Sequence, residues 1–161
     1  MPHSYVSLYT HIVYSTKNRT PQIDPALEER LFPYLAAIVR ELGGRACVIN
    51  GVPDHVHLLT ETSATIPLAH LIGKVKGCSS KWIHDTFPEH AKFEWQRGYG
   101  AFSVSRSIVP IVARYIERQK THHRKATFAD EFRALLAKHD ITARGKTPLD
   151  VKPVARYAIT A

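Results

Sequence analysis

Residues 53–59, with the sequence PDHVHLL, constrain the fold of this chain most, because two histidines flank one apolar residue in them. Side chains two positions apart in a strand share a face, so a strand here points His55 and His57 the same way. The apolar residues Val56 and Leu58 then point the other way. Two imidazoles fixed side by side make half of a site for a divalent metal ion.

Hydrophobic periodicity predicts that strands and helices alternate irregularly along the rest of the chain. Strands are expected over 5–14, 45–50, 55–60 and 93–105, and helices over 25–42, 67–82, 107–122 and 128–139. This order contains no regular parallel repeat of strand, helix and strand, so the expected fold class is α+β, with a mainly antiparallel sheet covered by helices. We expect residues 1–161 to form a single domain in which 142–161 is a C-terminal tail.

The charge of the chain favours a polyanionic partner. Lys and Arg exceed Asp and Glu by eight, and the pI is about 9.7. Charge alone favours a nucleic-acid partner and the absence of one about equally. No apolar run approaches the ~20 residues that span a bilayer, so no membrane partner is expected. The N-terminus lacks the basic start and apolar stretch of a secretion signal, which predicts a cytoplasmic protein.

The helix expected over 107–122 offers a second set of reactive side chains. Tyr115 and Gln119 are four residues apart and would share one face, with arginines around them that suit phosphate. Spacing alone favours a simpler interpretation, in which Tyr115 is the polar end of a core stripe. The histidine pair can likewise be two half-buried strand residues, and His122 and His123 can be residues favoured by the helix dipole.

Several further segments carry a resemblance to a known family. They are residues 11–17 (HIVYSTK), 48–59 (VINGVPDHVHLL), 98–105 (GYGAFSVS), 115–119 (YIERQ) with two histidines after it, and 127–132 (TFADEF). In this order and at these separations they resemble the single-tyrosine HUH transposases of bacterial insertion sequences, the TnpA-like or IS200-like enzymes. The likeness runs from about residue 5 to residue 141.

The resemblance implies a fold, a nucleophile and a cofactor. It implies an RRM-like or ferredoxin-like sheet, and cleavage of single-stranded DNA by Tyr115 through a 5′-phosphotyrosine intermediate. It further implies that His55, His57 and Gln119 hold a divalent metal, Mg²⁺ or Mn²⁺, which polarises the phosphate. No nucleotide cofactor is expected, because strand exchange conserves the ester energy and the chain has no phosphate-binding glycine loop.

The resemblance also implies partners: a homodimer, and single-stranded DNA folded into hairpins near element ends. Basic residues are candidate phosphate contacts, although surface solubility explains each almost as well: Lys74, Lys76, Lys81, Arg97, Arg106, Arg114 and Arg118.

Three alternatives remain open. A domesticated relative would apply the same chemistry to dispersed palindromic repeats. A nucleic-acid-binding module would have lost catalysis, although the four polar positions are present. A small zinc hydrolase would need a carboxylate base beside the histidines, and Asp54 is expected to point to the opposite face of the strand.

Overall fold

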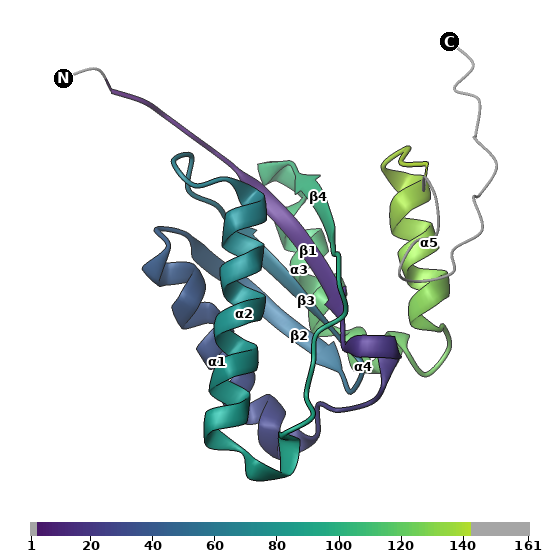
Figure 1. Cartoon of the computed structure of the whole chain (residues 1–161). Helices are drawn as coiled ribbons and strands as arrows, with labels where there is room; N and C mark the ends of the chain where they lie inside the picture. The colour runs from purple at the N-terminus through teal and green to yellow at the C-terminus, as the bar shows by residue number, and fades with distance from the viewer. Residues whose placement is uncertain (1–2, 143–161) are drawn as a thin grey trace. The chain divides into compact units, whose positions relative to one another are not determined.

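A computed structural model describes residues 3–142 of the chain (Figure 1). These residues divide between Lys120 and Thr121 into two compact units, which are described separately. The first unit contains the sheet, and the second contains the helix α5. The expectation of a single domain stays a prediction.

The first unit is a four-stranded antiparallel sheet with helices on both faces. The strands are β1 (Tyr9–Ser15), β2 (Arg45–Val52), β3 (His55–Glu61) and β4 (Gly100–Val104), in the order β2-β3-β1-β4. The helices are α1 (Pro25–Glu41), α2 (Leu68–Thr86) and α3 (Val109–Glu117), with 3₁₀ turns at η1 (Lys17–Arg19), η2 (Pro88–His90) and η3 (Arg106–Ile108). This βαββαβ order and strand arrangement are ferredoxin-like, which confirms the predicted α+β class.

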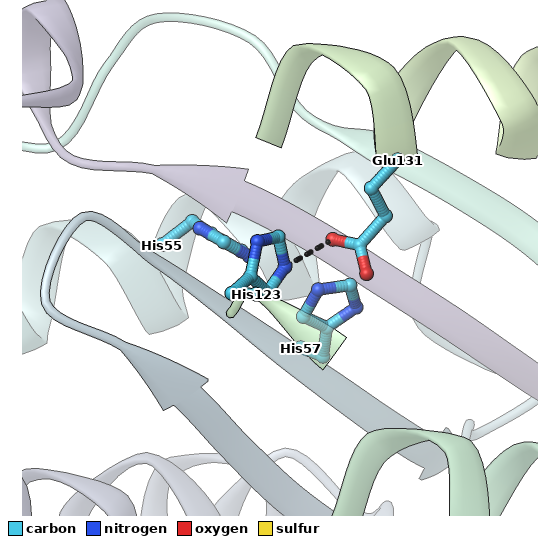
Figure 2. Close-up of side chains that lie close together, drawn as sticks. All are labelled: His55, His57, His123 and Glu131. Carbon is cyan, nitrogen blue, oxygen red and sulfur yellow. Dashed lines mark hydrogen bonds and ion pairs between the residues drawn. The ribbon is translucent and has the colours of Figure 1, made fainter. Parts of the chain in front are cut away.

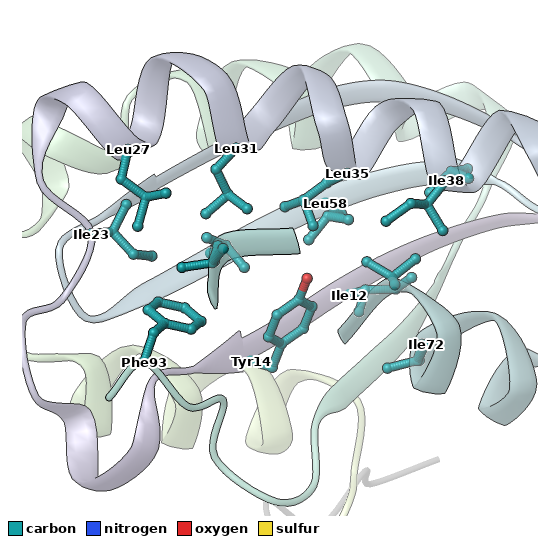
Figure 3. Packing of buried hydrophobic residues seen from close by; sticks show 14 of the residues in the cluster. Ile12, Tyr14, Ile23, Leu27, Leu31, Leu35, Ile38, Leu58, Ile72 and Phe93 are labelled. Atoms are coloured by element: carbon teal, nitrogen blue, oxygen red, sulfur yellow. The ribbon is translucent and has the colours of Figure 1, made fainter. Parts of the chain in front are cut away.

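The two faces of the sheet are covered by different helices (Figure 1). Helices α1 and α2 pack on one face around Ile12, Leu58 and Ile72, which are almost fully buried (Figure 3). Helix α3 packs on the other face, where Ile116 meets Leu59. The strand side chains alternate between these two environments, as the pleat of a sheet requires.

Helix α1 begins and ends where the sequence predicts. The Asp24 carboxylate accepts the Leu27 N–H at 2.8 Å, Pro25 occupies the first turn, and Gly43 follows the helix with φ +77°. A carboxylate cap and a glycine in the left-handed region are the usual signals at the two ends of a helix.

The hairpin of β2 and β3 depends on a close approach at Gly51. Its register pairs Asn50 with His57 and Val52 with His55, so β2 continues beyond the end predicted at residue 50. A Cβ atom at position 51 would lie 2.4 Å from the His55 carbonyl oxygen. Only glycine allows the two backbones to approach this closely.

Two predicted strands are shorter in the structure. β1 begins at Tyr9, because Glu61 and Val104, which pair with Tyr9, are the last residues of β3 and β4. Just before it, the Leu8 carbonyl oxygen accepts the Thr62 N–H at 2.8 Å outside the strand ladder. The segment 93–105 forms a strand only from Gly100. The backbone before this strand bonds to a side chain instead, because the Lys76 ammonium donates to the carbonyl oxygens of Gln96 and Gly98.

The prediction of one continuous helix over 107–122 is wrong. Helix α3 ends at Glu117, Arg118 departs from helical geometry with φ −94° and ψ 14°, and α4 (Gln119–His122) follows. Tyr115 and Gln119 therefore do not lie four residues apart on one regular helix.

The second unit contains α5 (Phe128–Lys138), which confirms the predicted fourth helix to within a residue. The Thr127 hydroxyl accepts the Asp130 N–H at 3.2 Å and caps it. The predicted tail lies outside the described residues from 143 onward. Within 3–142, no helix has both the length and the apolar character needed to cross a membrane.

Candidate active site

His55 and His57 both project from β3 (Figure 2), on the face of the strand where Leu59 packs against α3. Both side chains are fully buried, and their ring centroids are 5.2 Å apart. The strand alternation predicted from the sequence therefore places the two imidazoles side by side. Each is a residue type suited to metal binding.

His55 has a carboxylate partner that the sequence analysis assigned to the wrong face. The Nδ1 atom of His55 lies 2.6 Å from Oδ1 of Asp54, a hydrogen bond in which an N–H donates to the carboxylate. The prediction for Asp54 failed because this residue belongs to the turn between β2 and β3, where strand alternation does not apply. The bond fixes the orientation of the His55 ring.

His57 bonds to a third histidine that the sequence analysis did not single out as a site residue. The Nε2 atom of His11 lies 2.8 Å from Nδ1 of His57, and the rings stack with centroids 5.1 Å apart. His11 lies on β1 opposite Leu59, so it shares a face with the histidine pair. Finding it requires the pairing of β1 with β3, which no local pattern reveals.

Tyr115 lies on α3 beside these histidines. Its ring centroid is 6.0 Å from that of His57 and 6.2 Å from that of His11. The same ring packs against the apolar cluster that contains Ile116. The core-stripe interpretation and the reactive interpretation of Tyr115 therefore describe one position, at the border between the cluster and the histidines.

Asn50 attaches the end of α3 to the sheet. Its Nδ2 atom donates to the carbonyl oxygens of Ile116 at 2.9 Å and Glu117 at 3.0 Å. These carbonyls belong to the last turn of α3, where a helix runs short of N–H donors for its final carbonyls. Asn50 pairs with His57 across β2 and β3. The register of these two strands therefore determines the position of His57 and also the position of the helix end that Asn50 holds.

The donor set of the first unit fits a divalent metal. Both histidines of β3 use Nδ1 in a hydrogen bond, which is the arrangement that metal-binding histidines commonly show. Gln119 is fully buried at the start of α4. Its predicted role as a further ligand stays a prediction.

The candidate DNA-binding residues fall into two groups. Lys74, Lys76 and Lys81 lie on α2, across the sheet from the histidines, whereas Arg97, Arg106, Arg114 and Arg118 lie on exposed positions before β4 and around α3. Their roles in DNA binding stay predictions.

Lys76 has a structural role in the first unit. Its ammonium donates to the carbonyls of Gln96 at 2.6 Å and Gly98 at 2.8 Å, and lies 5.3 Å from the centroid of the Tyr14 ring. Burial lowers the pKa of Lys76 to about 8. Among the other lysines, Lys81 pairs with Asp85 on the same helix.

In the second unit, His123 bonds to a buried carboxylate. Its Nε2 atom lies 3.0 Å from Oε1 of Glu131 (Figure 2), and its Nδ1 atom lies 2.9 Å from the Ala126 carbonyl oxygen. His122 lies 3.4 Å from the other oxygen of Glu131, whose side chain is 1% exposed. The helix dipole is therefore not the only partner of these histidines, and the sequence analysis missed Glu131 as that partner.

The sheet and its helices define a protein with the fold of the tyrosine transposases. A candidate transposase from Deinococcus radiodurans R1 superposes with a TM-score of 0.60 at 23% identity, over 74% of this chain and 96% of its own. A REP-associated tyrosine transposase bound to a REP hairpin superposes with a TM-score of 0.58 at 12% identity, over 76% of this chain and 73% of its own. Both likenesses show the fold.

The chain belongs to the IS200-like transposase family, whose model matches residues 4–119. Its class of activity is therefore DNA transposition. None of the curated proteins matches the chain.

Proposed function

We propose that this chain cleaves and rejoins single-stranded DNA through a 5′-phosphotyrosine intermediate on Tyr115. The observation that carries the proposal is the position of the phenol beside the histidine pair, with the Tyr115 and His57 ring centroids 6.0 Å apart. Metal-assisted attack on a phosphodiester needs a nucleophile and metal ligands, which a tyrosine and two imidazoles supply. The positive charge of the chain favours binding of the anionic substrate.

In the proposed reaction the Tyr115 oxygen bonds to phosphorus and the bond from phosphorus to the 3′ oxygen breaks. The phenol loses its proton, and the departing oxygen gains one to become a 3′-hydroxyl. Attack of another 3′-hydroxyl on the phosphotyrosine restores the phenol and joins the strands. Asn50 supports this reaction by holding the end of the helix that carries the nucleophile.

His55 and His57, with Gln119 as the further ligand, would hold the divalent metal, Mg²⁺ or Mn²⁺. When bound, such an ion supplies Lewis acidity that withdraws charge from the scissile phosphate. The imidazoles contribute neutral nitrogen ligands, and their hydrogen bonds to Asp54 and His11 hold the rings in place.

The proposed substrate is a single strand folded into a hairpin. The net charge of +8 supports a nucleic-acid partner, and the REP-associated neighbour is described as bound to a REP hairpin. That neighbour also favours the second candidate, a domesticated relative that acts on dispersed palindromic repeats. We further propose a cytoplasmic homodimer.

The test is adduct formation with a labelled hairpin oligonucleotide in Mg²⁺ or Mn²⁺, followed on a denaturing gel. The wild-type protein is expected to form a covalent adduct that EDTA prevents and that Tyr115→Phe abolishes. Tyr99→Phe is the matched control, because Tyr99 is an exposed tyrosine that does not belong to the apolar cluster of Ile116. An adduct that persists in Tyr115→Phe contradicts the nucleophile, and tight hairpin binding without any adduct favours an inactive binding module.

A further inference from the structure

His11 lies between the two groups on which the proposed chemistry depends. Its Nε2 atom is 2.8 Å from Nδ1 of His57, and its ring meets that of Tyr115 edge-on, with centroids 6.2 Å apart. The residue is 3% exposed. It lies on the central strand β1, which pairs with β3 on one side and β4 on the other, so its backbone has little freedom to shift.

The direction of the bond between the two histidines determines what His57 offers to a metal. A neutral imidazole carries a hydrogen on one nitrogen and a lone pair on the other. If Nδ1 of His57 donates to His11, the lone pair of His57 is on Nε2 and is able to bind an ion. If Nδ1 accepts instead, Nε2 carries the hydrogen and cannot be a ligand.

We propose that His11 is a positioning residue whose Nε2 accepts the Nδ1–H of His57, and that it thereby fixes the tautomer in which Nε2 of His57 is the metal ligand. This inference rests on the proposed function, because it assigns the metal to His57. The bond from His55 to the Asp54 carboxylate, which can only accept, imposes the same tautomer on His55. Both histidines of β3 then present the same ring nitrogen.

The matched pair His11→Gln and His11→Asn tests the hydrogen-bond acceptor at the Nε2 position separately from the loss of the imidazole ring. A glutamine places its amide oxygen near the position of imidazole Nε2, whereas an asparagine reaches only as far as Nδ1. We therefore expect His11→Gln to keep an acceptor for His57 and His11→Asn to lose it, with the same chemical group in both variants. His70→Asn, at an exposed histidine of α2, is the control for removing an imidazole.

The first measurement is the tautomer of His57 in the metal-free protein, from two-bond ¹H–¹⁵N correlation spectra at alkaline pH, where imidazoles are neutral. The wild-type protein and His11→Gln are expected to show hydrogen on Nδ1, and His11→Asn to lose this preference. The second measurement is Mn²⁺ affinity by calorimetry, which we expect to fall about 10- to 100-fold in His11→Asn and to be largely restored in His11→Gln.

A wild-type His57 with hydrogen on Nε2 would overturn the inference, and this readout needs no variant to fold. Equal loss of Mn²⁺ affinity in both variants would also overturn it, since it would assign His11 a role other than acceptor. If the tautomer depends on residue 11 as expected but the wild-type protein forms no metal-dependent adduct, the proposed function fails and the direction of the hydrogen bond stands.

Discussion

The two faces of strand β3 are buried to the same degree but for different reasons. Val56 and Leu58 are fully buried against α1 and α2, where nothing but apolar contact is required of them. His55 and His57 are equally buried on the other face, and each has a hydrogen-bond partner from another residue. Exposure alone therefore does not distinguish the stabilising face from the candidate reactive face, whereas the polar partners do.

The largest effects are expected from Leu58→Ala and His57→Ala, which change adjacent residues on opposite faces. Leu58→Ala leaves a cavity in the main core and should lower the free energy of unfolding by about 2–5 kcal/mol, as urea denaturation would show. His57→Ala removes a proposed ligand and should reduce adduct formation more than about 100-fold. Adduct assays at a temperature where both variants are folded should leave Leu58→Ala active. If His57→Ala retained activity, the proposed division between the faces would be wrong.

A smaller and mixed effect is expected for Asn50→Ala. This change removes two hydrogen bonds to the last turn of α3 and should cost about 1–2 kcal/mol of stability. Adduct formation should fall about 10-fold, because the helix that carries Tyr115 is held less firmly. Ser103→Ala, at an exposed position of β4, is the control. Loss of stability with no loss of adduct would show that Asn50 serves only the packing of the helix.

The smallest effect is expected on the apolar side, from the titration of Lys76. Burial lowers the pKa of this ammonium from 10.5 to about 8, so between these values the unfolded chain binds more protons than the folded one. The stability of the wild-type protein should therefore rise with pH in this window relative to Lys76→Met, by less than about 1 kcal/mol because the group is half-buried. Urea denaturation of both proteins across the window measures the difference. A difference that falls as pH rises would contradict the lowered pKa.

The fold was predictable where the signal is local. The alternation in 55–59, the cap at Asp24 and the helical spacing after it each depend on neighbouring residues, and the structure confirms them. The first strand was predicted to begin too early. Its first residue is determined by the last residues of β3 and β4, with which it pairs, and local sequence does not reveal these.

The sequence indicated which proposed reactive groups lie close together, but not which groups hold them in place. His55, His57 and Tyr115 were singled out from spacing and resemblance, and the structure brings them together. His11, Asn50 and the true orientation of Asp54 depend on strand register and on turn geometry, so the sequence did not reveal them. The break at Arg118 was missed because helical periodicity continues across it.

Gly51 gives the hairpin an unusual sensitivity. Because a methyl group there would collide with the carbonyl of His55, any replacement must shift the backbone that carries this imidazole. A position without a functional group would then behave in a mutational scan for transposition as though it were catalytic. Tolerance to substitution at 51 would report on the spacing of two backbones, while the proposed metal ligands are side chains four and six residues further along the chain.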